Sequence, residues 1–372
     1  MTEFDAAALV RDPNTRVVVT CGSGGVGKTT TAAAIALIGA EAGRRTVVLT
    51  IDPARRLAQS MGLTELDNTP REVKGVANGQ LFAMMLDMKR TFDDVVLENS
   101  NPERAAQIFK NPFYQSLSSS FAGTQEYMAM EKLGQLVATN EWDLVIVDTP
   151  PSRSALDFLD APNRLGRFLD GRMIKLLSAP AKAGGRAYMK VVTVGVGMVA
   201  RVFTKVIGGD LLNDLSTFVS ALESMFGGFR ERADQTYQRL KDPGTAFIVV
   251  AAPEPDALRE ASYFVERLSQ EHMPLAGVVV NRTRNASPVE GGEPLSAAQA
   301  GVAADNVRED ASLASAALRV HAEIATAAEH DARMTKRFSS AHPEVPLVGV
   351  AALPTDVHDL EGLRTIGMLL GA

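Results

Sequence analysis

One short stretch limits what this chain can fold into more than any other. Residues 22–29 read GSGGVGKT and fit the pattern G-x-x-x-x-G-K-[ST]. The apolar run RVVVTC precedes them, and TTTAAAIALIGAEAG, a pattern typical of a helix, follows. A strand, a glycine-rich turn and a helix in this order point backbone N–H groups and a helix N-terminus at one anion. This context favours a phosphate-binding loop over a chance glycine-rich turn.

The residues of this loop have separate expected roles. Lys28 is expected to reach the β- and γ-phosphates of ATP and to act in catalysis, while the Thr29 hydroxyl is expected to bind Mg²⁺. The residues predicted to bind the nucleotide here are Gly22, Ser23, Gly24, Gly25, Val26, Gly27, Lys28, Thr29 and Thr30.

Apolar runs that recur along the chain predict the strands of one sheet. The runs are 16–21, 46–51, 80–87, 143–148, 245–251, 275–280 and 346–353. Several are apolar almost throughout, such as LVIVD and FIVVAA, which is typical of strands buried on both faces. Because helical patterns alternate with them, we expect an α/β fold with a doubly wound, mostly parallel sheet.

The remaining segments predict the domain organisation. Residues 15–150 and 244–372 are expected to form the core, with a helical segment at 88–140 that packs beside a helical insert at 151–243. A flexible tail is expected at 1–14 and a mobile loop at 283–314. The insert carries Met173, Met189, Met198 and Met225, which suit an adaptable apolar surface or simply its own core. The apolar stretch 191–207 is expected to cover a groove, and a membrane interface or core packing are its alternatives.

Two aspartates that follow predicted strands are candidates for the chemistry. Asp148 ends DLVIVD and is expected to hold Mg²⁺ through water, whereas a turn cap is the alternative. Asp52 follows TVVLTI and is expected to orient the attacking water as a catalytic residue. It could instead cap a helix that begins at Pro53.

Composition excludes several functional classes. The net charge of −6 disfavours a nucleic-acid partner. The single cysteine, Cys21, excludes a disulfide framework and suits a reducing compartment. The N-terminus has no secretory pattern, and the stretch 191–200 is too short to span a membrane. We therefore expect a cytoplasmic protein, or one peripheral at a membrane.

The phosphate loop, IDPARR and VDTPPS occur in an order that resembles the arsenite-pump and tail-anchored-protein-targeting ATPases. These ArsA-like anion-transporting ATPases have a deviant Walker A loop and belong to the wider group that includes the MinD and ParA positioning ATPases. The resemblance continues through PNRLGRFL, APEPDALREASYFVERL, GVVVNR and VPLVGVAALPTDVHDLEGL, over nearly the whole chain. It implies an ATP- and Mg²⁺-dependent ATPase that works as a dimer, with two nucleotides near the subunit interface.

The resemblance also assigns residues by position. Asp52 matches the catalytic aspartate of the first switch, and Asp148 matches the start of the second. Asn281 matches a nucleotide-binding asparagine, and its amide suits adenine because it both donates and accepts. Glu254 matches a nucleotide-binding glutamate, although an exposed acid at a helix start is the alternative. The nucleotide-binding residues so implied are Glu254, Asn281, Arg282, Pro354 and Asp356, the last two in the turn that resembles the loop over the base.

Three departures qualify the resemblance. The family's loop carries a signature lysine that crosses to the partner's phosphates, where this chain has Ser23. Either a paralogous subunit supplies that lysine in a heterodimer, or Arg55, Arg56 or Arg153 of a homodimer replaces it. The C-x-x-C pair of the eukaryotic targeting ATPases is absent, so no zinc is expected. Arsenite pumps hold the soft metalloid ion with several thiolates, which this chain lacks, so arsenite transport is not expected. The chain thus resembles a bacterial member of the family without the zinc pair and the lysine.

The preferred functional hypothesis is a dimeric ATPase that couples its nucleotide state to a hydrophobic client or a membrane-protein partner. The alternative is a positioning or regulatory ATPase like MinD and ParA. The long helical insert favours the first hypothesis, and the C-terminal segment EGLRTIGMLLGA is too short and weakly charged for the amphipathic basic helix that would favour the second. A small-molecule kinase would need a second-substrate site, which the sequence does not indicate. Electron transfer of the nitrogenase-iron-protein type would need cluster cysteines, which the sequence lacks.

Overall fold

The computed structural model describes residues 3–52, 56–112, 114–115, 118, 124–150, 231–284, 295–307 and 311–371. The chain divides into two compact units. The first comprises Met1–Met85, Asn140–Leu156 and Leu240–Ala372, and the second comprises Leu86–Thr139 and Asp157–Arg239. The helical segment expected at 88–140 therefore belongs to the second unit and not to the sheet unit.

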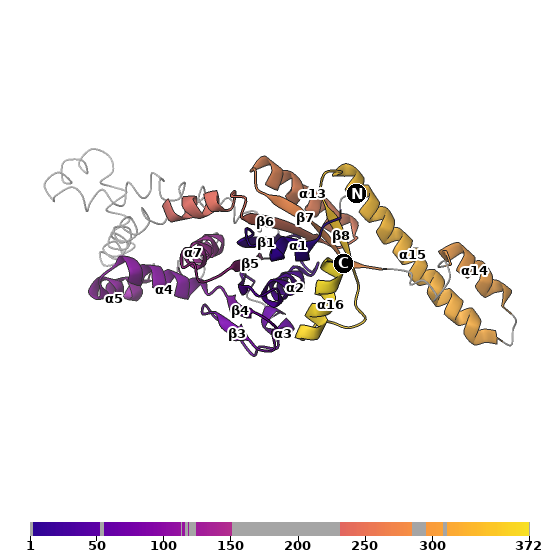
Figure 1. Ribbon diagram of the computed structural model, residues 1–372, viewed down its shortest axis with the longest axis horizontal. Coiled ribbons are helices and arrows are strands. Elements are labelled where there is room, and N and C mark those ends of the chain that lie inside the picture. The colour runs from indigo at the N-terminus through magenta and orange to yellow at the C-terminus, as the bar shows by residue number, and fades with distance from the viewer. Residues whose placement is uncertain are drawn as a thin grey trace, which may run out of the picture. The chain divides into compact units, whose positions relative to one another are not determined.

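The first unit is built around one eight-stranded sheet (Figure 1). Its strands are β1 (Val17–Cys21), β2 (Arg45–Thr50), β3 (Arg71–Val73), β4 (Gln80–Met85), β5 (Leu144–Asp148), β6 (Thr245–Ala251), β7 (Leu275–Thr283) and β8 (Leu347–Ala351). The order is β3-β4-β2-β5-β1-β6-β7-β8, and only the β3–β4 pair is antiparallel. The mostly parallel α/β fold and all seven expected strands are confirmed. The short edge strand β3 was not expected, because two of its three residues are charged and the segment shows almost no apolar pattern.

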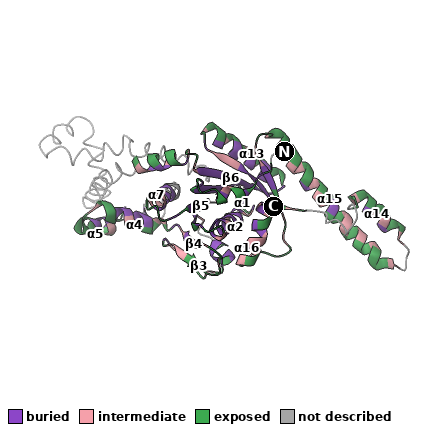
Figure 2. Ribbon diagram, viewed as in Figure 1, coloured by how far each residue is buried: buried purple, intermediate pink, exposed green. Residues whose placement is uncertain are grey.

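Helices cover both faces of this sheet. α1 (Ala6–Arg11), α2 (Lys28–Glu41) and α16 (Leu360–Leu370) lie together on one face, and α13 (Pro255–Gln270) lies on the other (Figure 1). The short helix α3 (Arg56–Ser60) follows β2. The central strands β1, β5 and β6 are buried along their whole length, in the purple interior of Figure 2. α2 is rich in alanine, so its backbone can pack closely against these strands.

The N-terminal segment differs from the flexible tail expected at 1–14. Asp5 caps α1, and Phe4, Ala6 and Val10 are buried in the core. The guanidinium of Arg44, itself 8% exposed, donates to the carbonyls of Val10, Asp12 and Thr15 at 2.8, 3.1 and 2.6 Å. A buried arginine must find acceptors for its N–H groups, and here backbone carbonyls of the N-terminal segment and of Asp143 accept from it.

A helical hairpin replaces much of the mobile loop expected at 283–314. α14 (Ala297–Asn306) begins at a capping box formed by Ser296 and Gln299. It packs along α15 (Ser312–Ala341), a helix of 30 residues that extends away from the sheet (Figure 1). The many alanines that favour helix formation also give a weak hydrophobic pattern, which is why composition alone indicated a loop.

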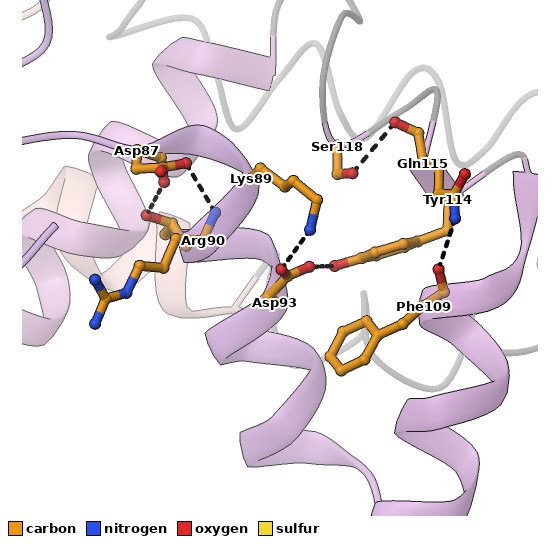
Figure 3. Close-up of polar contacts among 9 residues, drawn as sticks. Asp87, Lys89, Arg90, Asp93, Phe109, Tyr114, Gln115 and Ser118 are labelled. Atoms are coloured by element: carbon orange, nitrogen blue, oxygen red, sulfur yellow. Dashed lines mark hydrogen bonds and ion pairs between the residues drawn. The ribbon is translucent and has the colours of Figure 1, made fainter. Parts of the chain in front are cut away.

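The described part of the second unit is helical. It comprises α4 (Met88–Asn99), α5 (Pro102–Lys110), α7 (Thr124–Ala138) and residues 231–239. Figure 3 shows how α4 and the segment after α5 are joined: the buried Tyr114 hydroxyl donates to Asp93 at 2.6 Å, and Lys89 pairs with the same carboxylate. Glu131 of α7, almost fully buried, accepts from Arg232 at 2.9 Å. These polar ties join helices that the sequence separates by up to about a hundred residues.

Several expectations lie outside the described residues. They concern Arg55, Arg153, the four methionines of the insert, the stretch 191–207 and the start of a helix at Pro53. Among the helices that the structure does describe, none is long and apolar enough to cross a membrane.

Candidate active site

The phosphate loop occupies the turn between β1 and α2, as its motif requires. Gly24 and Gly25 are exposed, so the backbone of the loop is accessible to a ligand. Gly27 caps α2 with a φ of +95°, a conformation that L side chains rarely adopt. A Cβ there would also collide with the side-chain amide of Asn281. Glycine is therefore needed at position 27 for both its conformation and its size.

Lys28 begins α2 and is only 6% exposed. Its Nζ donates to the Ser23 carbonyl at 2.8 Å, so the ammonium group folds back over the loop. Burial lowers the pKa of Lys28, and the negative charges of Asp148 and Asp52 oppose that shift. A desolvated ammonium group beside an exposed glycine-rich loop is suited to binding an anionic phosphate.

Asp148 lies at the end of β5, fully buried between two hydroxyl groups. Its Oδ2 accepts from Thr29 Oγ1 at 2.8 Å and from Thr50 Oγ1 at 2.9 Å. Burial raises the pKa of Asp148 to about 6, although both hydroxyls and Lys28 act in the opposite direction. The parallel order β2-β5-β1 brings these side chains together, because it places the carboxyl end of β5 beside those of β2 and β1.

This arrangement fits a magnesium ion. Asp148 Oδ1 is buried without a hydrogen-bond partner, and a cation or its bound water would satisfy it. A carboxylate and a hydroxyl are hard oxygen ligands of the kind Mg²⁺ prefers, and Mg²⁺ usually keeps several waters. Among the described residues no group of three or more His, Cys, Asp or Glu side chains could hold a metal ion.

Asp52 lies two residues beyond β2, at the same edge of the sheet. Its backbone N–H donates to Thr50 Oγ1 at 3.2 Å. Its carboxylate is close enough to influence both Lys28 and Asp148 electrostatically. Arg56, the first residue of α3, also acts on Lys28. Arg56 is thus the one candidate for replacing the signature lysine that lies within the described residues.

A second group of expected residues lies at the carboxyl ends of β6 and β7. Asn281 is 7% exposed, and its Nδ2 donates to the carbonyl of Val26 in the phosphate loop at 2.9 Å. Its Oδ1 accepts from the backbone N–H of Arg282, which adopts a φ of +61°. Glu254 is exposed and precedes Pro255 at the start of α13, where its side chain makes no capping hydrogen bond. Its carboxylate is therefore not used by the helix.

Pro354 and Asp356 lie in the turn after β8, and both are exposed. The start of this turn is tied to β7, because Ala352 N donates to the Thr283 carbonyl at 2.9 Å. All these residues lie at or just beyond the carboxyl ends of neighbouring parallel strands. We call the loop residues 22–27 together with Lys28, Thr29 and Asp148 the phosphate side of the site. Glu254, Asn281 and Asp356 are called its base side.

The sequence reasoning missed two features of this region. Thr50, which holds Asp148, could have been suspected because it precedes Asp52 at the end of a predicted strand. The ion pair of Arg284 with Asp331 joins the end of β7 to α15. No sequence pattern indicated it, since the two residues lie in segments expected to have different structures.

A groove of about 470 Å³ lies elsewhere, between α1, α2 and α16. Its lining includes Ile38 and Glu41 near the C-terminus of α2, at the opposite end of that helix from Lys28. It is therefore separate from the phosphate loop.

The fold and the loop geometry define a P-loop nucleotide-binding core. Residues 15–300 match the family described as Anion-transporting ATPase, and the chain belongs to that family.

Three relatives illustrate the distance within the family. The chain is 29% identical over 269 residues to ATPase ARSA2 of Chlamydomonas reinhardtii, covering 70% of this chain and 66% of that protein. It is 26% identical over 264 residues to ATPase ASNA1 homolog 1 of Paramecium tetraurelia, covering 70% and 73% of the two chains. It is 26% identical over 262 residues to ATPase GET3A of Arabidopsis thaliana, covering 70% and 65%.

Proposed function

We propose that this chain binds ATP with Mg²⁺ and hydrolyses it to ADP and phosphate, and that the nucleotide state controls binding of a hydrophobic client. The observation that carries the ATPase part is the cluster at the start of α2. There a buried Lys28 lies beside an Asp148 carboxylate that Thr29 contacts at 2.8 Å. The client part rests on the resemblance and on the helical second unit.

Each residue of the phosphate side has a distinct role in this proposal. The amides of the loop and the N-terminus of α2 bind the phosphate oxygens. Lys28 exchanges its hydrogen bond to the Ser23 carbonyl for one to the β- and γ-phosphates. Thr29 and Asp148 would hold Mg²⁺, which supplies charge neutralisation for the phosphates when bound.

Asp52 orients the attacking water. The water oxygen bonds to the γ-phosphorus while the bond from that phosphorus to the bridging oxygen breaks, and ADP leaves with the bond electrons. The proton of the water leaves toward the Asp52 carboxylate or the released phosphate. Loss of the γ-phosphate removes a ligand from the segments after Asp52 and Asp148, and these segments carry the change to the helical unit.

The partner is proposed from the absence of the signature lysine. Ser23 is too short and carries no charge, so a site in a dimer of identical chains needs another cation. Arg56 is one candidate, since its positive charge is close enough to Lys28 to contribute to lowering the pKa of that lysine. Arg55 and Arg153, outside the described residues, are further candidates from this chain, and a paralogous subunit with the lysine is the alternative to all three.

The test is steady-state hydrolysis of ATP by the purified chain, with its mass in solution measured under the same conditions. Hydrolysis by a homodimer that falls at least about a hundredfold in Asp52→Asn supports the proposed chemistry and a cation from this chain. ATP binding with negligible turnover points to a heterodimer. Failure to bind ATP at all would contradict the proposal. Added apolar peptide that changes the hydrolysis rate would support the client role.

A further inference from the structure

The segment between Asn281 and Arg284 connects the candidate site to α15. At one end Asn281 Nδ2 donates to the Val26 carbonyl of the phosphate loop at 2.9 Å. The last residues of β7 are irregular: Arg282 has a φ of +61°, and the β7–β8 pairing shifts register between Asn281 and Thr283. We call residues 281–284 the irregular turn. At the other end, Arg284 contacts Asp331 of α15. The position of Asn281 therefore depends on how this irregular turn is held.

Asp331 holds the turn with three hydrogen bonds. Arg284 donates its backbone N–H and its Nε to Asp331 Oδ2, both at 2.9 Å, and its Nη2 to Oδ1 at 2.6 Å. The Asp331 side chain is 2% exposed and that of Arg284 is 50% exposed. Burying the Asp331 carboxylate costs free energy unless the charge is paired and hydrogen-bonded. The charge-assisted bidentate pair with Arg284 offsets that cost, and its geometry is specific.

Arg284 also lies within electrostatic reach of Glu254, the acid of the base side. Its hydrogen bonds, however, go to Asp331, and Glu254 acts on it only as a more distant charge. Without the Asp331 carboxylate, the turn would lose these three anchoring hydrogen bonds. Asp331 both fixes the turn and keeps Arg284 directed toward α15.

We propose that Asp331 and Arg284 are positioning residues that hold Asn281 in place to select the adenine base. The inference rests on the proposed function, in which Asn281 binds the base. It adds that α15, a helix that lies entirely beyond the residues matched to the family, sets the selectivity of the nucleotide site.

The test compares the dissociation constants of Mg–ATP and Mg–inosine triphosphate, which share their phosphates and ribose and differ in the base. The wild-type chain should prefer ATP. Asp331→Asn should reduce that preference by about tenfold, the size expected for one weakened polar contact, and leave binding of inosine triphosphate within about twofold. Glu329→Gln is the matched control, since Glu329 is exposed on the same helix and pairs with Arg333 at 3.9 Å. It also accepts from Ala297 N at 3.3 Å, a bond that the amide oxygen of Gln can keep, so the variant should change neither constant.

A purely structural role would lower both affinities together with the melting temperature, so an equal loss for both nucleotides overturns the inference. Should Asp331→Asn fail to fold, Arg284→Lys keeps the positive charge but loses the bidentate geometry, and it should reduce the ATP preference in the same direction. An unchanged preference in that variant also overturns the inference.

Asn281→Ala distinguishes a failure of this inference from a failure of the proposed function on which it rests. If it abolishes the ATP preference while Asp331→Asn does not, positioning by α15 is wrong and the base site stands. If it leaves the preference intact, the base is bound elsewhere and the inference falls with that assignment. If the wild type binds neither nucleotide, the proposed function itself is wrong.

Discussion

The phosphate side and the base side of the candidate site are built in different ways. On the phosphate side, Lys28 and Asp148 are buried and hydrogen-bonded to groups at the ends of adjoining strands. On the base side, Glu254 and Asp356 are exposed, and Asn281 is held by an irregular turn whose far end is anchored on a helix. The phosphate side is preorganised by the sheet, whereas the base side depends on elements added around it.

This difference indicates which substitutions affect each side of the site. Changes to the phosphate side act directly on groups that the sheet holds in one arrangement. Changes to the base side can come from a residue 47 positions away in the sequence, as for Arg284 and Asp331. Substitutions should therefore distinguish the two sides, first by their effect on the hydrolysis rate, then by their effect on stability, and finally at the contact that Asn281 makes with the loop.

The largest effect is expected for Asp148→Asn. The amide keeps the size of the side chain but removes the negative charge that would face Mg²⁺, so the hydrolysis rate should fall about 100- to 1,000-fold. Asp143→Asn is the matched control, because Asp143 adjoins the amino end of the same strand and accepts from Arg45 N at 2.8 Å. Steady-state kinetics should find its rate within about twofold of wild type. Comparable rates for the two variants would contradict the roles given to the two ends of β5.

A smaller effect concerns the stability of the protein without nucleotide or metal. Burial raises the pKa of Asp148 from its ordinary value of 3.8 to about 6, so between these values the folded state binds more protons than the unfolded state. The contribution of Asp148 to the free energy of unfolding therefore falls as the pH rises from about 4 to 6 and then levels off. The full shift corresponds to about 3 kcal/mol.

Asp148→Asn does not titrate, and it provides the reference for this prediction. Denaturant unfolding in the presence of EDTA should find the stability of the variant, relative to wild type, increasing from pH 4 to 6. A stability difference that is independent of pH would mean that burial does not penalise the Asp148 charge, and that the phosphate side is more hydrated than the structure indicates.

The smallest effect tests the contact between the two sides. Gly27→Ala introduces a Cβ at a φ of +95° that also meets the Asn281 amide, whereas Gly25→Ala introduces one at a φ of +79° with no atom within 4 Å. Both variants should lose about 1–2 kcal/mol from backbone strain, and Gly27→Ala should lose about 1–3 kcal/mol more from the collision.

Denaturant unfolding of the two variants measures this extra loss. The double variant Gly27→Ala/Asn281→Ala should recover much of it, because the shorter side chain leaves room for the new Cβ. Equal losses for the two single variants, or no recovery in the double variant, would mean that the phosphate side and the base side are not in direct contact.

Much of the fold was predictable because its signals are local. Parallel strands buried on both faces need continuous apolar runs, and all seven predicted strands are present. The edge strand β3, helix α1 and the hairpin of α14 and α15 were missed because their burial depends on distant partners. Arg44 illustrates this: nothing near it in the sequence indicates that its guanidinium binds carbonyls of the N-terminal segment more than 28 residues away.

The sequence by itself determined the phosphate loop and the parallel sheet. The strand, the glycine-rich turn and the helix are formed by neighbouring residues, and the eight residues 22–29 are enough to indicate phosphate binding. Only the tertiary structure decided that Thr50 and Thr29 share one oxygen of Asp148, because that depends on the strand order β2-β5-β1. It alone also placed Asp331 against Arg284, since a helix of 30 residues has many polar positions and only its packing on β7 selects the one that is buried.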